Sequence, residues 1–129
     1  MTGYVGKIEA ATLANTNFRQ VIFTGVHQQL VLMSLLPGEE IGSEVHAQVD
    51  QFFRFESGQG KVVINGEETL VSDGDAAVVP AGSEHNIINT SQTAPLKLYT
   101  IYSPPNHPAG TVHVTKAEAE AAEAAEHQV

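Results

Sequence analysis

Several side chains that can bind a metal ion lie at short spacings in two separate stretches of the chain. Glu44 and His46 are two residues apart, so on a strand both side chains project from the same face and can share one ligand. Gln51 follows in the same stretch, and His85 comes just after the turn sequence Pro80-Ala81-Gly82 in the second. Together they offer nitrogen and oxygen donors, which suit a divalent metal ion.

These residues belong to two spaced motifs. The first reads Gly38-x5-Glu44-x-His46-x4-Gln51-x6-Gly58, and the second reads Gly74-x5-Pro80-x-Gly82-x2-His85-x3-Asn89. Both resemble the paired signature of the cupins, written G(x)5HxH(x)3-4E(x)6G and G(x)5PxG(x)2H(x)3N. The second motif matches at every position. The first keeps the spacing but has Glu44 where the family usually has His and Gln51 where it usually has Glu.

The resemblance covers roughly residues 30 to 103 and implies a small β-barrel that holds one metal ion. Because the family pattern allows three or four residues after the histidine, either Asp50 or Gln51 can occupy the last position of the first motif. An inward Gln51 also sends Phe53 and Phe55 inward and Arg54 outward, since side chains alternate along a strand. An inward Asp50 would bury Arg54 instead. Burying each Phe gains about 2 to 3 kcal/mol, whereas an unpaired buried Arg is costly, so we expect Gln51 to point inward.

The ligand set expected from the resemblance is therefore Glu44, His46, Gln51 and His85. Compared with the usual three His and one Glu, the acid has moved from the third position to the first and the charge is unchanged. Two oxygen donors replace one, which favours Zn, Mn or Fe(II) over Cu(I). We expect one divalent ion per chain, with Gln51 the weakest donor and a candidate for a supporting hydrogen bond only.

Two further histidines are candidate acids or bases. His107 and His113 flank a Pro- and Gly-containing segment that can fold over the mouth of the barrel, and we treat both as candidate catalytic residues.

Composition restricts the class of protein. The chain has no Cys, so thiol catalysis, Cys-based zinc sites and disulfides are excluded. Its net charge of −9 disfavours nucleic acid and anionic membranes as partners. The first twenty residues contain no apolar run of signal-peptide length, so we expect a cytoplasmic protein. The six bases are scattered singly, which disfavours phosphorylated ligands unless one base is well placed.

The pattern of short apolar runs cut by Gly, Pro, Asn and Asp predicts an all-β fold, and the resemblance implies a double-stranded β-helix, the jelly-roll barrel of the cupins. Residues 1–17 are expected to form an N-terminal arm, 18–103 the barrel, and 104–129 an extended Pro-rich segment with a peripheral C-terminal helix. Asn65-Gly66 predicts a type I′ hairpin turn. Thr115 and Glu118 form a capping box that opens the helix. Expected strands span 18–24, 30–36, 44–47, 51–57, 61–64, 68–71, 76–79, 84–89 and 96–102.

Three functions fit these features. The first is a metal-dependent enzyme on a small polar metabolite, with isomerase-like or other Lewis-acid chemistry. The second is an Fe(II) dioxygenase that uses Glu44, His46 and His85 as a two-His-one-carboxylate triad. The third is a non-catalytic small-molecule binding protein. Since cupins commonly pair, a homodimer is expected.

Overall fold

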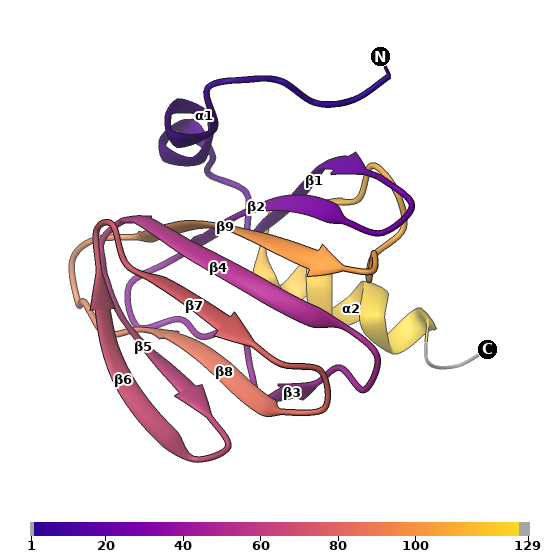
Figure 1. Cartoon of the computed structure of the whole chain (residues 1–129). Helices are drawn as coiled ribbons and strands as arrows, with labels where there is room; N and C mark the ends of the chain where they lie inside the picture. The colour runs from indigo at the N-terminus through magenta and orange to yellow at the C-terminus, as the bar shows by residue number, and fades with distance from the viewer. Residues whose placement is uncertain (1, 127–129) are drawn as a thin grey trace.

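The strands form two antiparallel sheets that pack face to face. The computed structural model describes residues 2–126. Within them the larger sheet has the order β10-β1-β2-β9-β4-β7 and the smaller sheet the order β3-β8-β5-β6 (Figure 1). The expected jelly-roll barrel is therefore present. The larger sheet contains β1 (Arg19–Thr24), β2 (Gln29–Leu35), β4 (Asp50–Ser57), β7 (Ala76–Val79), β9 (Leu96–Ser103) and β10 (Val112–His113). The smaller sheet contains β3 (Glu44–Val45), β5 (Gln59–Ile64), β6 (Glu67–Ser72) and β8 (Glu84–Asn89).

The core lies between the two sheets and follows from the alternation of side chains along the strands. In β9 the inward residues are Leu96, Leu98, Thr100 and Tyr102, and all four are buried. Toward one end the inward positions are apolar, whereas Thr100 and Tyr102 near the other end are polar. The barrel thus has an apolar half that provides stability and a polar half that can hold a site.

Two turns position the motif residues. Asn65 and Gly66 have φ values of +48° and +82°, as the predicted type I′ hairpin between β5 and β6 requires. At Gly58 a Cβ atom would lie 2.6 Å from the carbonyl oxygen of Pro95, so only glycine fits there.

Asn89, the last residue of the second motif, has a structural role. Its buried Nδ2 donates to the carbonyl oxygens of Leu35, Leu36 and Ala94. These bonds satisfy carbonyl groups where three chain segments meet, so the side chain holds the ends of β2, β8 and β9 together.

Two elements were not predicted. The N-terminal arm contains helix α1 (Ile8–Ala14), which packs on β9, β4 and β2, on the outside of the larger sheet in Figure 1. The two-residue strand β10 pairs with β1 at the sheet edge. A strand of two residues is too short to be recognised from the alternation of apolar and polar residues in the sequence.

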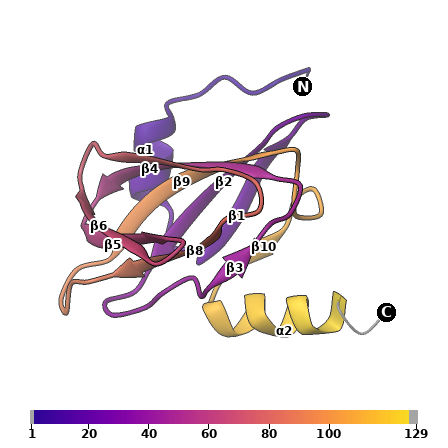
Figure 2. The same ribbon diagram turned by 60° about the horizontal axis from the view of Figure 1, so that its bottom comes forward.

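The C-terminal helix α2 (Lys116–Glu126) begins where the capping box predicts, with the amide of Glu118 donating to Thr115 Oγ1 at 3.2 Å. It packs against β10, at the edge of the larger sheet (Figure 2). Ala119 is buried in the main core cluster, so the helix is less peripheral than the sequence suggested. Neither helix among residues 2–126 is long and apolar enough to cross a membrane.

Candidate metal centre

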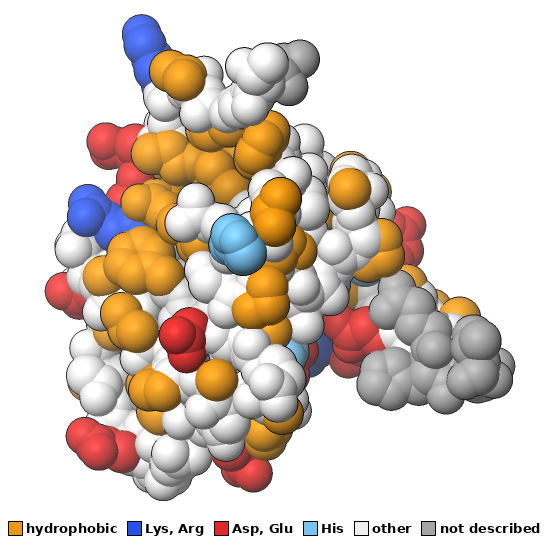
Figure 3. Space-filling view, turned by 45° about the vertical axis from the view of Figure 1, so that its right-hand side comes forward, with side chains coloured by type: hydrophobic (Ala, Val, Ile, Leu, Met, Phe, Trp, Pro, Cys, Tyr) orange, Lys and Arg blue, Asp and Glu red, His pale blue; other side chains and the backbone are white. Residues whose placement is uncertain are grey.

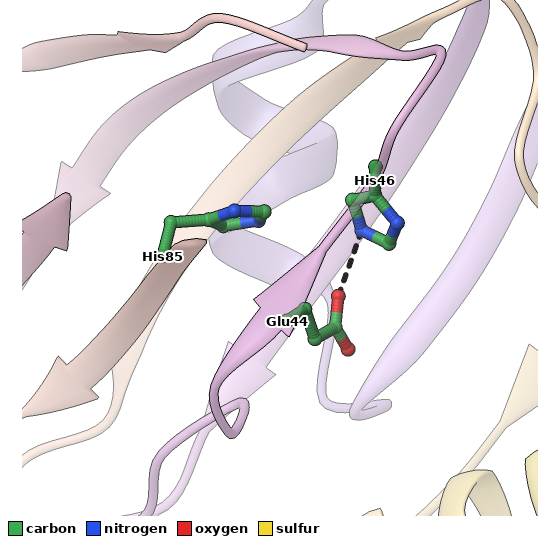
Figure 4. Close-up of side chains that lie close together, drawn as sticks. All are labelled: Glu44, His46 and His85. Atoms are coloured by element: carbon green, nitrogen blue, oxygen red, sulfur yellow. Dashed lines mark ion pairs between the residues drawn. The ribbon is translucent and has the colours of Figure 1, made fainter. Parts of the chain in front are cut away.

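Glu44, His46 and His85 come together at the polar end of the barrel. Glu44 on β3 and His85 on β8 are direct cross-strand partners, and His46 follows immediately after β3. One ligand atom from each of the three side chains lies within 4.8 Å of the others. Figure 4 shows the two imidazoles and the carboxylate turned toward a common space. Two imidazoles and one carboxylate in this arrangement can bind a divalent transition metal.

Nε2 of His46 faces the carboxylate of Glu44, as expected if both bind the same metal ion. The nitrogen lies 2.8 Å from Glu44 Oε2, the contact marked in Figure 4. Nε2 of His46 is buried, and the carboxylate of Glu44 is its one polar contact within residues 2–126. A histidine nitrogen and a carboxylate oxygen that meet at one point, with the imidazole of His85 nearby, can bind a common cation.

Backbone groups hold the ring of His85 and the main chain of His46 in place. Nδ1 of His85 lies 3.0 Å from the carbonyl oxygen of Ser83, which favours a proton on Nδ1 and leaves Nε2 free as a ligand. The amide of Gly82 donates to the carbonyl oxygen of His46 at 2.9 Å. This bond joins the Pro80-Ala81-Gly82 turn of the second motif to the ligand-bearing loop of the first. The turn therefore fixes the distance between the two motifs.

Gln51 points into the barrel, as predicted, and Asp50 points out. Gln51, Phe53 and Phe55 are buried, whereas Asp50 is exposed and accepts a hydrogen bond from the amide of Ala81 at 2.8 Å. The Nε2 group of Gln51 donates to Thr100 Oγ1 at 2.9 Å. Its Oε1 is buried and has no hydrogen-bond partner. The amide is thus oriented with its acceptor free, which suits either a metal ion or a donor on a bound molecule.

The electrostatic surroundings keep Glu44 ionised. Burial alone would raise the pKa of Glu44, but the adjacent His46 and the positive charge of Arg19, with a smaller contribution from His85, lower it below its usual value. A carboxyl group that stays charged can bind a cation without first losing a proton.

Tyr102 and His107 lie beside these three side chains. The ring of Tyr102 meets the ring of His46 edge-on, with centroids 6.0 Å apart, and its hydroxyl lies 3.2 Å from Nε2 of His107. Burial raises the pKa of Tyr102 to about 12. Burial, with the nearby charge of Arg19, lowers the pKa of His107 to about 3. Near pH 7 the phenol therefore keeps its proton and the imidazole is neutral.

The loop that carries His107 is fixed by Gln29, a fully buried residue of β2. Oε1 of Gln29 accepts hydrogen bonds from the amides of Asn106 and His107, and its Nε2 donates to the carbonyl oxygen of His107 at 2.7 Å. The segment after β9 is thereby held against the barrel at Tyr102, close to the candidate metal ligands.

His113 lies in a different environment. It pairs with Arg19 across β10 and β1, and its Nδ1 lies 3.4 Å from Nη1 of Arg19. The same nitrogen of Arg19 forms an ion pair with Glu123 Oε1 on α2 at 3.3 Å. Of the two candidate catalytic histidines, His107 thus contacts the Tyr102 that packs on His46, and His113 contacts a buried arginine.

The sequence analysis assigned no functional role to Tyr102 or Arg19. Alternation along β9 from the apolar Leu96 and Leu98 could have placed Tyr102 inside the barrel. For Arg19 there is no comparable signal, because a single base at the start of a strand is usually exposed.

Comparisons with known proteins agree with this architecture. A model of the family described as "Cupin domain" matches residues 31–102. YrkC, an uncharacterized protein of Bacillus subtilis (strain 168), is 53% identical over 126 residues, which cover 93% of this chain and 67% of YrkC. The uncharacterized protein L612 of Acanthamoeba polyphaga mimivirus is 45% identical over 88% of this chain and 72% of its own length. The crystal structure of BH2720 from Bacillus halodurans is 47% identical and superimposes with a TM-score of 0.89 over 92% of this chain and 93% of that one. The chain belongs to the cupin superfamily.

Proposed function

We propose that this cupin binds one divalent metal ion through Glu44, His46 and His85, with Oε1 of Gln51 as a fourth donor, and that it is an enzyme acting on a small polar metabolite. The observation that carries the proposal is the convergence of donors at one point. Three donor groups lie within 4.8 Å of one another, and Gln51 Oε1, on the inward face of β4, is buried without a hydrogen-bond partner. Buried polar atoms without partners are rare in folded proteins, so the free Oε1 of Gln51 favours a further ligand for this amide.

The donor set favours Zn, Mn or Fe(II), because it combines two imidazoles with two oxygen donors and has no sulfur. When bound, the ion would supply Lewis-acid polarisation of a carbonyl or enediolate oxygen. The single carboxylate of Glu44 leaves a divalent ion with excess positive charge, which favours an electron-rich ligand oxygen.

The chain's own contribution to chemistry centres on Tyr102. Because its pKa is raised to about 12, its phenol is protonated at pH 7 and can hydrogen-bond to an oxygen of the bound metabolite. His107, with its pKa lowered to about 3, is a weak base at that pH. His107 therefore acts through its contact with the Tyr102 hydroxyl, which it orients. His113 has no such contact with Tyr102 among residues 2–126, and its catalytic role remains a prediction.

One observation favours an alternative function. Glu44, His46 and His85 have the composition of the two-His-one-carboxylate triad of Fe(II) oxygenases. Oxygen consumption separates the alternatives: an oxygenase consumes O2 with Fe(II) and is inactive with Zn, whereas Lewis-acid chemistry proceeds with redox-inert Zn under nitrogen.

The binding proposal is tested by elemental analysis of protein purified without chelator. We expect about one divalent metal ion per chain and its loss in His46→Ala and His85→Ala, since a small mononuclear site rarely survives removal of one strong ligand. The matched control is His27→Ala, because His27 is exposed and lies outside both motifs. Stoichiometric metal in both ligand variants, with unchanged circular dichroism, would refute the assignment.

The remaining expectations about partners stay predictions. A homodimer and a small-molecule ligand fit the fold, and a non-catalytic carrier would use the same site without turnover. Light scattering on the purified chain measures the oligomeric state directly. A mass near 13.7 kDa, that of one chain, would exclude the dimer at that concentration.

A further inference from the structure

Three polar side chains, here called the polar row, lie side by side on the inward face of the larger sheet. Tyr102 of β9 is the direct cross-strand partner of Gln29 on β2 and of Gln51 on β4. All three side chains are buried, with exposed fractions of 0% for Gln29, 3% for Gln51 and 2% for Tyr102. Buried polar groups cost stability unless they have partners, so the partners of this row indicate what it does.

The outward side chains beside the polar row are apolar. Leu30, Ile101 and Phe52 lie next to it on the same three strands, are cross-strand neighbours of one another, and are partly exposed. Figure 3 shows apolar side chains gathered on one outer face of the molecule. An antiparallel sheet usually has the opposite arrangement, with apolar residues inside and polar residues outside. Because this inversion gives up stability from apolar burial, it indicates a functional role for the polar row.

The side-chain amide of Gln29 holds the segment after β9. Its Oε1 accepts hydrogen bonds from the amides of Asn106 and His107 at 3.1 and 3.0 Å, and its Nε2 donates to the carbonyl oxygen of His107 at 2.7 Å. Nε2 also donates to Thr24 Oγ1 at 2.9 Å. Both main-chain polar groups of His107 are thus bound by one side chain, which fixes where its imidazole begins.

The imidazole of His107 connects this anchor to the candidate metal centre through Tyr102. Its Nε2 lies 3.2 Å from the Tyr102 hydroxyl, and the two rings meet edge-on, with centroids 5.1 Å apart and an interplanar angle of 84°. The ring of Tyr102 also meets the ring of His46 edge-on, at 6.0 Å between centroids. Hydrogen bonds and ring contacts therefore join Gln29 to a candidate metal ligand without a break.

The direction of the hydrogen bond between His107 and Tyr102 decides what the phenol can offer to a ligand. A phenol donates one hydrogen bond and can accept others, whereas a neutral imidazole carries its proton on one of two nitrogens. If Nε2 of His107 carries the proton, it donates to Tyr102 Oη and leaves the phenol proton available. If Nε2 has no proton, the phenol donates to His107 and has none to give.

We infer that Gln29 is a positioning residue of the site, which places His107 so that its Nε2–H donates to Tyr102 Oη and the phenol O–H is left for a bound ligand. The ligand class is a small molecule whose carbonyl or anionic oxygen accepts this hydrogen bond. The inference rests on the proposed function, since it requires a ligand held at the metal centre beside His46.

The first measurement uses the full-length protein without added metal. Proton–nitrogen NMR spectra of the histidine rings give the tautomer of His107, and we expect the proton on Nε2. Gln29→Met keeps the length of the side chain and removes its bonds to the loop, so nuclear Overhauser contacts between the rings of His107 and Tyr102 should be lost. Thr24→Val is the matched control, because it removes a bond of Gln29 that does not reach the loop, and the ring contacts should persist.

The second measurement asks whether this placement acts on a ligand. The probe is acetate, titrated into full-length protein loaded with Co(II) and followed by the visible spectrum of the metal. Tyr102→Phe removes one hydrogen-bond donor and should weaken acetate binding about tenfold, the scale of one hydrogen bond to a charged group. Gln29→Met should weaken it to a similar extent. The double variant should lose no more than either single variant, because a positioning residue acts through the group that it places.

The outcomes separate this inference from the proposed function. A proton on Nδ1 of His107, or additive losses of acetate affinity in the double variant, would overturn the inference and leave the metal site standing. If Gln29→Met does not fold, His107→Phe retains an aromatic ring and the main-chain bonds to Gln29 but lacks Nε2, and unchanged acetate affinity in that variant would also overturn it. Native protein that binds no Co(II) would refute the proposed function, and the inference with it.

Discussion

Gln51 on β4 and Thr100 on the neighbouring strand β9 are diagonal neighbours, and the hydrogen bond between their side chains determines which end of the Gln51 amide remains free. The Nε2 group donates to Thr100 Oγ1 at 2.9 Å, so Oε1 is the end left without a partner. Oxygen is the end of an amide that binds metal ions, because the amide nitrogen has no available lone pair. Thr100, a fully buried polar residue that follows the apolar Leu96 and Leu98 on the inward face of β9, thus has a function in orienting a candidate ligand.

Substitution of Gln51 tests this arrangement. Gln51→Ala should weaken metal binding by about 10- to 100-fold, as expected for a weak or supporting ligand. Gln51→Glu should strengthen binding, because it adds a negative charge and the Thr100 hydroxyl can donate to the new carboxylate. Competition with a chromophoric chelator measures both affinities. Gln48→Ala is the control, since Gln48 is exposed in the loop between β3 and β4. Equal affinity in Gln51→Ala and the native protein would remove Gln51 from the ligand set.

The orientation of Gln51 could be predicted because it depends on local rules. Alternation along one strand and the opposite burial preferences of Phe53 and Arg54 are enough to decide which face is inside. The Asn65-Gly66 hairpin and the Thr115 cap are local in the same sense, as the contacts that define them lie within a few residues. The strand boundaries consequently came within a few residues of those observed.

The positions of α1 and Arg19 could not be predicted, because both depend on distant contacts. Helix α1 has no side-chain cap, and its stability comes from packing on β9, β4 and β2. The environment of Arg19 is made by His113 and Glu123, which are 94 and 104 residues away in the chain. No spacing rule links a base on the first strand to a helix at the far end of the chain.

The low pKa of His107 predicts a pH dependence of stability. Its pKa falls from 6.5 to about 3 on folding, chiefly through burial. Between these values the unfolded chain takes up a proton that the folded chain does not, so the free energy of unfolding decreases as the pH falls from about 6.5 toward 3. Above about pH 6.5 the imidazole is neutral in both states and contributes no slope.

His107→Gln removes this contribution and should flatten the difference in stability between pH 7.5 and pH 4.5. Urea unfolding followed by far-UV circular dichroism measures it, with His27→Gln as the exposed control. Other carboxyl groups begin to titrate as the pH falls toward 4.5, so the informative quantity is the difference between variant and native protein at each pH. The same pH dependence in His107→Gln as in the native protein would contradict a buried, neutral His107.

Removal of α2 tests how far the barrel depends on its C-terminal helix. Deletion of the residues after Thr115 should leave the two sheets folded, since Ala119 is the one residue of α2 in the described core and every β-strand of residues 2–126 precedes the cut. The loss of Ala119 burial should cost about 1 to 2 kcal/mol. That corresponds to a melting temperature lower by roughly 3 to 8 °C for a chain of this size.

The truncated protein also separates the two groups of contacts that α2 makes. Without the helix, Arg19 loses Glu123 but gains access to water, so its charge is hydrated rather than left unpaired and no further large destabilisation is expected. Glu123→Gln in the full-length chain isolates the ion pair, and comparison of the two melting temperatures gives the share due to Ala119. A truncated chain that aggregates or melts without cooperativity would contradict this expectation. It would mean that α2 completes the core and that the two sheets do not fold stably without it.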